Sequence, residues 1–380
     1  MREFHGAGAI AELARPAILH RYVPARGCRA FPPSRRQVSF GMAELLQSRT
    51  LEVPRSEWTA IVAKYAGADV RRALWQVANT LIPLAVLLWA MYACLDTAPW
   101  VTALLVLPGA GLLVRTFIIM HDCSHSSFLP WPKVNDALGF VTGVLTLTPF
   151  SQWRRDHALH HASSGDLDRR GHGDVPTITV KEYLARDARG RLIYRLVRHP
   201  LSLMLVGPLH LMLNQRFRGR SKATKTKQLY SVWYTNLAIA AAIVASILLW
   251  GPRAVLLVYL PCMYVAAAAG IWLFYVQHQF EDAYWETHEE WDYATAAITG
   301  SSHLRLNPVL QWFTGSIGLH HVHHIGPKIP NFRLQEAHDN NPIFEAAPSM
   351  TIGMGIKALR LALYDEDTKR LVRFSDVQAA

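Results

Sequence analysis

Residues 254–280 read AVLLVYLPCMYVAAAAGIWLFYVQHQF, a run without any Asp, Glu, Lys or Arg. A helix needs about 20 apolar residues to cross the hydrocarbon core of a bilayer, and this run is longer. Its end carries a histidine, His278, at the point where such a helix would leave the lipid. The run therefore predicts a membrane span with an ionisable side chain at one end.

Three other runs of the sequence have the same character. Two of them are free of charged residues, and the third holds only Arg115 near one end. Short links, around Asp96 and at residues 251–253, join the four runs in pairs, which predicts two helical hairpins. The predicted spans cover about residues 73–95, 97–120, 229–252 and 254–277.

Two shorter uncharged stretches, residues 137–153 and 201–215, each contain a proline. Their lengths fall near the range of re-entrant and interfacial helices, so we expect neither of them to cross the membrane.

The composition agrees with a folded membrane protein. Of the 380 residues, 51% are hydrophobic and 18% are charged, which excludes an intrinsically disordered chain. The four cysteines show no CxxC spacing, so neither a disulfide framework nor a thiolate metal site is predicted. The net charge is +11, and the basic residues flank apolar runs. This placement favours anionic lipid headgroups over nucleic acid as the partner.

The basic residues also predict the orientation and the domains. They lie before the first and third predicted spans rather than in the hairpin links, so the positive-inside rule places both termini in the cytoplasm. Residues 121–228 and 278–380 then form a cytoplasmic cap, and residues 42–380 form one membrane domain. Residues 1–41 are rich in Arg and are predicted to be a disordered tail. The basic run at residues 216–227 is most simply interpreted as a topology signal. It also offers candidates for contact with a lipid phosphate or an electron donor, namely Arg216, Arg218, Arg220 and Lys222.

Histidines cluster in three short motifs. The first is His121–His125, with HxxxH spacing, and residues 157–161 and 320–324 both contain an HxxHH pattern. Residues i and i+4 share one face of a helix, so the imidazoles of each motif point the same way. Chance gives HxxHH in only about one such chain in 25, and two copies in about one in a thousand. The three motifs together therefore predict a metal site.

The number of histidines indicates more than one metal ion. Eight or nine imidazoles are too many for a single tetrahedral zinc, but they match two ions with four or five ligands each. Imidazole suits Zn, Cu, Fe and Ni, so the ligand type leaves the metal open. An all-nitrogen dinuclear site at a membrane surface fits iron that is used for oxygen chemistry.

The sequence segments around these motifs resemble those of the membrane-bound fatty acid desaturases, and most of all the bacterial acyl-lipid and Δ12 (ω6) kind. The resemblance runs from about Ala73 to Phe332. Its most specific words are YVQHQFED at residues 275–282, SGDLDRRG at 164–171, GLHHVHH at 318–324 and PKIPN at 327–331.

The resemblance implies an all-α integral membrane fold, with four transmembrane helices in two hairpins and a cytoplasmic helical cap that holds two irons. It implies an O2-dependent enzyme that introduces a double bond into a lipid acyl chain. His321 lies outside the family spacing, and Phe274 stands where family members have an Asn that holds a water. The implied iron ligands are His121, His125, His157, His160, His161, His278, His320, His323 and His324.

The resemblance also implies partners and a location. No cytochrome b5 motif is present in the sequence, so we expect a separate electron donor, ferredoxin- or cytochrome b5-like, with its reductase. We expect the chain in a bacterial inner membrane with its active site on the cytoplasmic side. Three carboxylates adjoin the implied ligands and are candidates to orient their imidazoles, namely Asp122, Asp156 and Asp282.

Two other functions stay open on the sequence alone. The same histidine motifs serve diiron hydroxylases and ketolases that act on alkanes, carotenoids or sphingolipids, although the words around His278 favour a desaturase. A metal transporter or sensor would carry ionisable residues near the middle of its spans. The histidines here lie at the ends of the spans, which argues against transport.

Overall fold

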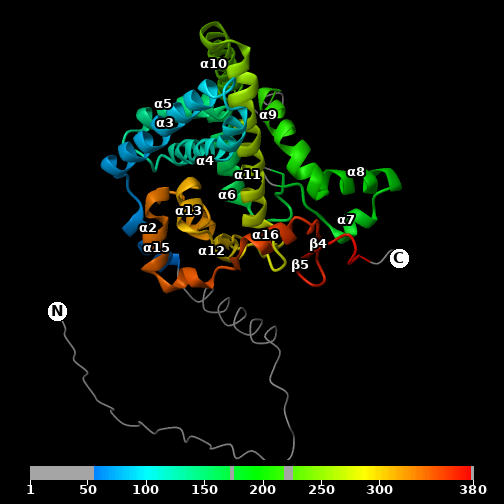
Figure 1. Cartoon of the computed structure of the whole chain (residues 1–380). Helices are drawn as coiled ribbons and strands as arrows, with labels where there is room; N and C mark the ends of the chain where they lie inside the picture. The colour runs from blue at the N-terminus through cyan, green and yellow to red at the C-terminus, as the bar shows by residue number, and fades with distance from the viewer. Residues whose placement is uncertain (1–54, 172–174, 218–225, 378–380) are drawn as a thin grey trace, which may run out of the picture. The chain divides into compact units, whose positions relative to one another are not determined.

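The structure is a computed structural model, and it describes residues 55–171, 175–217 and 226–377. The predicted tail, residues 1–41, lies outside the described residues, as do Arg218, Arg220 and Lys222. The described part of the chain is mostly helical, as predicted (Figure 1).

Four helical segments are long and apolar enough to cross a membrane, which makes this a multi-pass membrane protein. Each begins and ends within a few residues of a predicted span, and the prediction of four transmembrane helices is confirmed. The fourth segment opens as a π-helix, η2, and continues as an α-helix. The spans are α3 (Val70–Ala93), α4 (Pro99–Ser124), α10 (Thr226–Trp250), and η2 (Ala254–Tyr259) with α11 (Leu260–His278).

The spans pack through small residues and a few polar contacts. A Cβ added at Gly109 of α4 would lie 2.7 Å from the Sγ of Cys262, so α4 and α11 approach closely there. The hydroxyl of Thr102 donates a hydrogen bond of 2.8 Å to the carbonyl of Met91, which joins α4 to α3. Helices α4 and α11 pack against each other, and both end in histidines of the predicted site.

Neither of the two shorter apolar stretches is one of the four spans. Residues 137–153 are divided between α5 (Pro132–Leu145) and α6 (Phe150–Ser163), and Leu147 adopts a left-handed φ of 53° at the break. The second stretch forms η1 (Ser202–Val206) and α9 (Gly207–Phe217), which leave the preceding helix α8 (Ala188–Arg198) at a bend of 64°. This bent pair would be a fifth span only if its two arms formed one broken helix.

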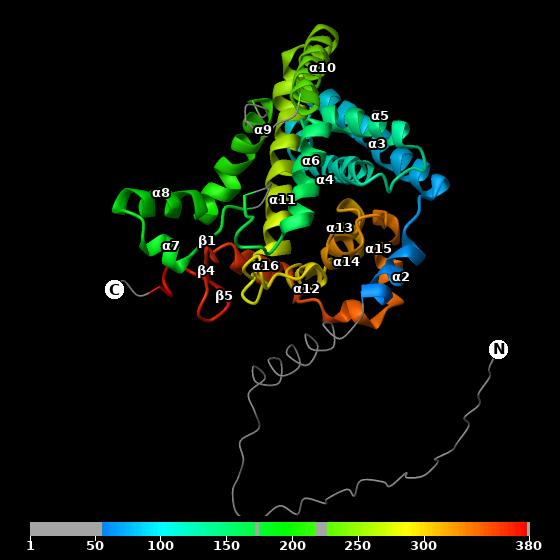
Figure 2. The ribbon, with the colours of Figure 1, turned by 180° about the vertical axis from the view of Figure 1, so that it is seen from behind.

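The remaining elements build the cap, which lies on the side of the spans where α4 and α11 end (Figures 1 and 2). Its helices are α2 (Arg55–Tyr65), α7 (Val180–Leu184), α12 (Tyr293–Thr299), α13 (Pro308–Phe313), α14 (His320–Ile325), α15 (Asn331–Asp339), η3 (Pro342–Ala346) and α16 (Ile352–Ala358).

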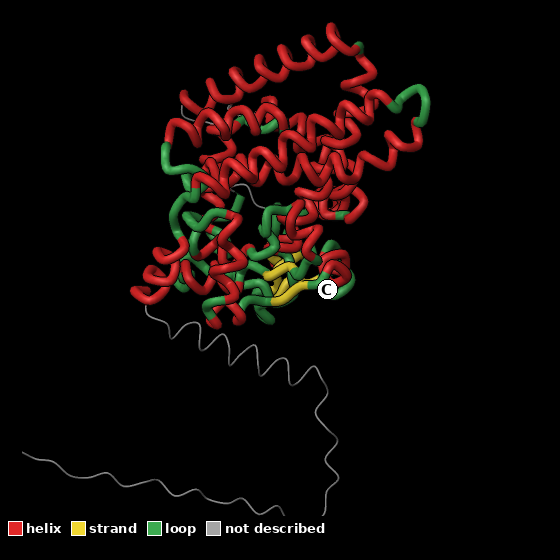
Figure 3. Tube along the Cα trace, turned by 60° about the vertical axis from the view of Figure 1, so that its left-hand side comes forward, coloured by secondary structure: helices red, strands yellow, loops and turns green. Residues whose placement is uncertain are grey.

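The cap also contains short strands, which were not predicted from the sequence (Figure 3). They are only two or three residues long, so they leave no alternating pattern to recognise. In one sheet β1 (Ile178–Thr179) runs parallel to β4 (Leu363–Asp365), which pairs antiparallel with β5 (Arg370–Val372). In the other sheet β2 (His303–Leu304) runs parallel to β3 (Ser349–Met350).

A continuous apolar core joins the spans to the cap. One cluster of buried side chains includes Leu113 of α4, Val276 of α11 and Leu304 of β2. Arg115 of α4 adds a polar link, because its guanidinium donates to the hydroxyl of Thr80 at 3.1 Å and to the carbonyl of Trp312 in α13. The histidine-bearing ends of the spans are therefore held against the cap.

Candidate metal centre

Nine histidines come together in two adjacent groups where the cap meets α4 and α11. Within each group the possible ligand atoms all lie within 4.8 Å of one another. These nine are the histidines that the resemblance implied. The first group is His121, His125, His157, His161 and His323, and the second is His160, His278, His320 and His324.

The helices bring these side chains together in the way that their spacing predicts. α4 supplies His121 and ends at His125, so both imidazoles face the first group. α6 and α14 each carry an HxxHH pattern, and each helix contributes to both groups. The two groups are therefore neighbours because α6 and α14 carry histidines of both.

In the second group the Nε2 atoms converge on one point. The Nε2 of His278 lies 3.1 Å from that of His160 and 2.9 Å from that of His320. The Nε2 of His320 lies in turn 3.0 Å from that of His324. The Nδ1 of His278 faces the carbonyl of Gly300 at 3.1 Å. A carbonyl only accepts, so Nδ1 carries the proton and the Nε2 lone pair faces the group.

The first group has the same arrangement. The Nε2 of His161 lies 3.1 Å from that of His157 and 3.0 Å from that of His323. The Nε2 atoms of His121 and His125 are buried and have no hydrogen-bond partner in the described part of the chain. A buried imidazole nitrogen without a partner is costly, and a metal ion would satisfy it.

The spacing of these nitrogens fits ligands that share a metal ion. Two nitrogens bound at right angles to one ion, with metal–nitrogen bonds of about 2.1 Å, lie about 3.0 Å apart. The observed separations of 2.9 to 3.1 Å agree with that value. The residues present therefore fit a metal ion in each group.

Burial keeps these imidazoles in the form that binds metals. It lowers the pKa of His157, His161 and His323 well below the ordinary value, and neighbouring imidazoles lower it further. The same causes act on the pKa of His320 and His324. A neutral imidazole offers a lone pair, whereas a protonated one does not.

Asp122 orients one imidazole of the first group. Its Oδ1 accepts a hydrogen bond of 3.0 Å from the Nδ1 of His121. Its Oδ2 accepts two more, of 2.6 Å from the backbone N–H of Asn331 and 2.8 Å from the Asn331 side chain. Asp122 was predicted from the sequence, whereas Asn331 was missed, although Asn331 closes the PKIPN word behind the third motif.

The other two candidate carboxylates have different surroundings. Asp156 accepts hydrogen bonds of 3.1 and 3.2 Å from the side chain of Gln152, one turn earlier on α6. Asp282 lies at the surface, 62% exposed, where it pairs with Arg370 at 3.0 Å. The geometry thus supports an orienting role for Asp122 better than for Asp282.

Two further predictions concern neighbours of the site. The Nε2 of His321, which was left out of the ligand set, contacts the Nδ1 of His338 at 3.1 Å, outside both groups. The ring of Phe274 lies 5.0 Å from that of His160 and 5.3 Å from that of His278. An apolar side chain therefore borders the second group at the position where family members have an Asn.

Arg216, a candidate for contact with a lipid or an electron donor, binds two groups of the protein itself. Its guanidinium donates to the side chain of Asn236 in α10 at 2.9 Å and to the carbonyl of Leu147. The physical reason is the break before α6, where the left-handed Leu147 leaves a carbonyl that needs a donor. Arg216 therefore ties α9 to α10 and to this break.

Comparison with known proteins agrees with this geometry. Residues 97–354, more than half of the chain, match the family model described as "Fatty acid desaturase". A fatty acid desaturase of Bacillus subtilis is 41% identical over 333 residues, which cover 88% of this chain and 94% of that protein. The chain belongs to the fatty acid desaturase family.

More distant relatives have more specific names. The desaturase is 27% identical over 240 residues to the "sn-1 oleoyl-lipid 12-desaturase" of Synechocystis, covering 60% of this chain and 64% of that protein. It is 26% identical over 236 residues to the "Acyl-lipid omega-3 desaturase (cytochrome b5)" of Arabidopsis thaliana, covering 58% of each. The family makes this protein an oxidoreductase of lipid metabolism.

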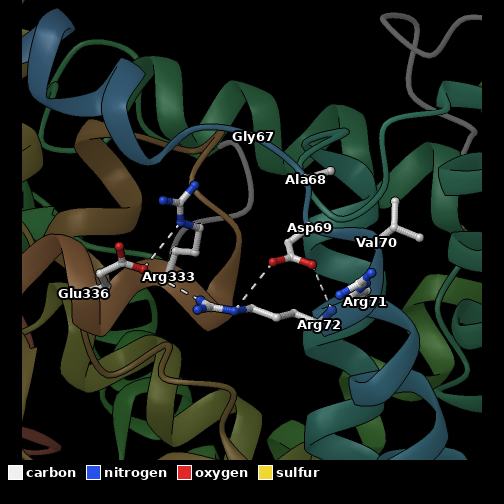
Figure 4. Close-up of a pocket in the computed structure, with 8 residues that line it drawn as sticks. All are labelled: Gly67, Ala68, Asp69, Val70, Arg71, Arg72, Arg333 and Glu336. Carbon is white, nitrogen blue, oxygen red and sulfur yellow. Dashed lines mark hydrogen bonds and ion pairs between the residues drawn. The ribbon is translucent and has the colours of Figure 1, made fainter.

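A polar cavity of about 540 Å³ lies between the start of α3 and the cap of the desaturase (Figure 4). Arg72 lies between two carboxylates, 3.6 Å from Asp69 and 3.7 Å from Glu336. Arg333 lies 3.5 Å from the same Glu336. Arg333 and Glu336 belong to α15, whose first residue bonds Asp122, and the Arg72–Glu336 pair links this helix to the start of α3.

Proposed function

We propose that this desaturase introduces a double bond into a lipid-linked acyl chain and that two irons, held by the nine clustered histidines, provide the oxidant. The observation that carries the proposal is the convergence of five and four imidazoles, all buried except the half-buried His125, on two adjacent points. The ligands in this proposal are His121, His125, His157, His161 and His323 for one iron, and His160, His278, His320 and His324 for the other.

Iron bound at these groups would supply the oxidising power, drawn from O2 and two electrons, to remove a hydrogen from each of two neighbouring methylenes. The acyl chain loses two hydrogens, a donor supplies two electrons and the solvent supplies two protons. Together they reduce O2 to two waters. An unactivated methylene has no polar group that the protein could bind, so the residues around the site must select the carbon by its position.

The side chains of this protein hold and orient the imidazoles. The Asp122 carboxylate and the backbone carbonyl of Gly300 each accept a hydrogen bond from the Nδ1–H of one histidine, which directs its Nε2 lone pair into the groups. Ser164, which follows α6, lies 3.5 Å from the same Nδ1 of His278. Removal of these acceptors would free the rings to turn.

We also propose a separate electron donor and a cytoplasmic site. The name of the Arabidopsis relative mentions cytochrome b5, which supports an external one-electron donor of that kind or a ferredoxin. The histidine-bearing ends of α4 and α11 lie on the side that carries Arg71, Arg72 and Lys328. By the positive-inside rule this is the cytoplasmic side, and the bacterial relative supports a bacterial cell membrane, which is the inner membrane where a cell has two.

Expression in a bacterial host without polyunsaturated lipids tests the proposal. Mass spectrometry of the fatty acids should reveal a new double bond, and His160→Ala or His323→Ala should abolish it while the protein still inserts into the membrane. A product with an added oxygen would instead identify a hydroxylase. An unchanged lipid profile from folded, iron-loaded protein with a working reductant would refute the desaturase assignment.

A further inference from the structure

Helix α8 has two unlike faces. Tyr194 and Arg198 on one face are almost completely buried. On the other face four apolar side chains point outward, and they lie within an arc of about 140° around the helix. These side chains are Leu192, Ile193, Leu196 and Val197, which are 57%, 50%, 57% and 48% exposed.

The buried face fixes how α8 is turned. The hydroxyl of Tyr194 donates to the carbonyl of Ala362 at 2.7 Å. The guanidinium of Arg198 donates to the carbonyl of Leu361 and to the side chain of Gln279, both at 2.9 Å. These bonds hold the helix to the cap, so the apolar face cannot rotate inward to bury itself.

The same bonds set the height of α8 relative to the membrane. Arg198 also donates to the hydroxyl of Tyr275 at 3.1 Å. Tyr275 belongs to the last turn of α11, and Gln279 is its C-cap, so α8 lies at the level where this span leaves the lipid. Figures 1 and 2 show α8 at this level, beside the spans and above the strands of the cap.

The charges on α8 and in the turn before it are mostly positive. The segment 186–197 holds four arginines and one acid, Asp187, whose carboxylate is occupied in capping the helix through the N–H of Gly190 at 2.7 Å. A basic helix with a broad apolar face is typical of elements that lie in the headgroup region of an anionic leaflet. The four arginines are Arg186, Arg189, Arg191 and Arg195.

The apolar surface continues beyond α8 toward the spans. After the bend of 64°, η1 and α9 expose Leu205, Val206 and Leu209. This arm contacts α11, because the hydroxyl of Tyr264 donates to the carbonyl of Leu205 at 2.9 Å. An apolar strip therefore leads from α8 directly to the surface of a membrane span.

We propose that α8 is an in-plane anchor that binds the anionic leaflet on the histidine side of the membrane. Its leucines, isoleucine and valine enter the acyl boundary, and Arg189, which is exposed on the same side of the first helical turn, contacts a lipid phosphate. This leaflet also contains the ends of α4 and α11, so the anchor fixes the depth of the cap relative to the lipid.

A spin label at Leu196→Cys tests the depth of this face in nanodiscs that contain phosphatidylglycerol. The background is Cys28→Ser with Cys94→Ser, since Cys123 and Cys262 are buried. A label at Asp367→Cys, a position 78% exposed on the cap, is the control. Power-saturation EPR should find the label at 196 open to O2 and shielded from an aqueous nickel chelate, and the control label the reverse.

Equal access of the chelate to both labels would overturn the proposal. Dipolar broadening between labels at 196 would also overturn it, because the face would then bind a second copy of the chain. The charge contribution has its own test, since Arg189→Gln should lower the number of phosphatidylglycerol molecules that native mass spectrometry finds on the protein. Arg191→Gln, on the side of the helix that faces the cap, is the matched control and should leave the number unchanged. An unchanged number in the Arg189→Gln protein would contradict the role of this arginine. None of these readouts depends on desaturase activity.

Discussion

At the scale of the residue, Asp122 connects more parts of the site than its position in the sequence suggests. It accepts a hydrogen bond from His121 with one oxygen and two from Asn331 with the other, so one carboxylate links α4, the first histidine group and α15. A buried carboxylate with three donors is well satisfied, and its loss would leave all three unpaired.

Asp122→Asn should weaken iron binding at the first group. Hydrogen-bond partners of metal-bound histidines typically contribute a factor of about 10 to 100 in metal affinity. The measurement is iron retained per chain during titration with a chelator, compared with Asp282→Asn, whose carboxylate lies at the surface. Equal retention by both variants would show that Asp122 does not support the site.

His321 provides a test within a single motif. It is buried and contacts His338, whereas His320 beside it belongs to the second group. His320→Ala should remove iron from the second group, and His321→Ala should retain both irons even if the lost packing lowers the melting temperature. Loss of iron from the His321→Ala protein would place that residue in the ligand set.

At the scale of the element, the close approach of α4 and α11 depends on Gly109. A Cβ there meets the sulfur of Cys262 at 2.7 Å, whereas nothing lies within 4 Å of a Cβ added at Gly270 on α11. Gly109→Ala should therefore lower the free energy of unfolding by about 1 to 3 kcal/mol, the usual cost of overpacking. Gly270→Ala should leave it unchanged or raise it, because alanine favours a helix.

Thermal unfolding of the two variants in the same detergent measures this difference. A melting temperature that falls equally in both would indicate that helix packing at Gly109 is loose. Iron content provides a second readout, since separation of α4 from α11 would also separate the ends that carry His121 and His278.

The segment that follows α6 is held by a buried carboxylate. Burial raises the pKa of Asp166, but hydrogen bonds from Arg169 and from His288 at 2.8 Å outweigh this effect and leave the pKa below its ordinary value. A carboxyl with a lowered pKa in the folded state stabilises the protein above its unfolded pKa, and that contribution is lost as the pH falls through the folded pKa.

Acid should therefore loosen this segment below about pH 4. Asp166→Asn should lower the melting temperature at pH 7 and reduce its further fall below about pH 4 relative to the wild-type protein. Melting curves over this range, with Asp282→Asn as the surface control, provide the comparison. An identical acid response in the Asp166→Asn variant would show that the carboxylate does not anchor the segment.

At the scale of the whole molecule, the sequence predicts the spans and the histidine groups because both leave strong patterns. The spans need long runs without charge, and the ligands need histidines at helical spacing. The supports of the site leave no such pattern. Asn331 lies 209 residues from Asp122, and the carbonyl of Gly300 is a backbone group, so only folding brings them to the imidazoles.

The protein contacts of Arg216 and Asp282 have the same explanation. Arg216 belongs to a basic run, and such a run predicts a membrane surface. Its actual partner is a carbonyl exposed by the left-handed Leu147, a feature of the backbone that composition does not reveal. Asp282 closely follows the fourth span in sequence, but the turn after α11 directs it to Arg370.

The central claim is that the nine histidines hold two irons. Iron content of the purified protein, combined with X-ray absorption at the iron edge, tests it most directly. We expect two irons per chain, each surrounded by nitrogens at about 2.1 Å, and the loss of iron from one group when His160 or His323 becomes alanine. A single ion per chain, or zinc in place of iron with the same acyl product formed, would contradict the claim.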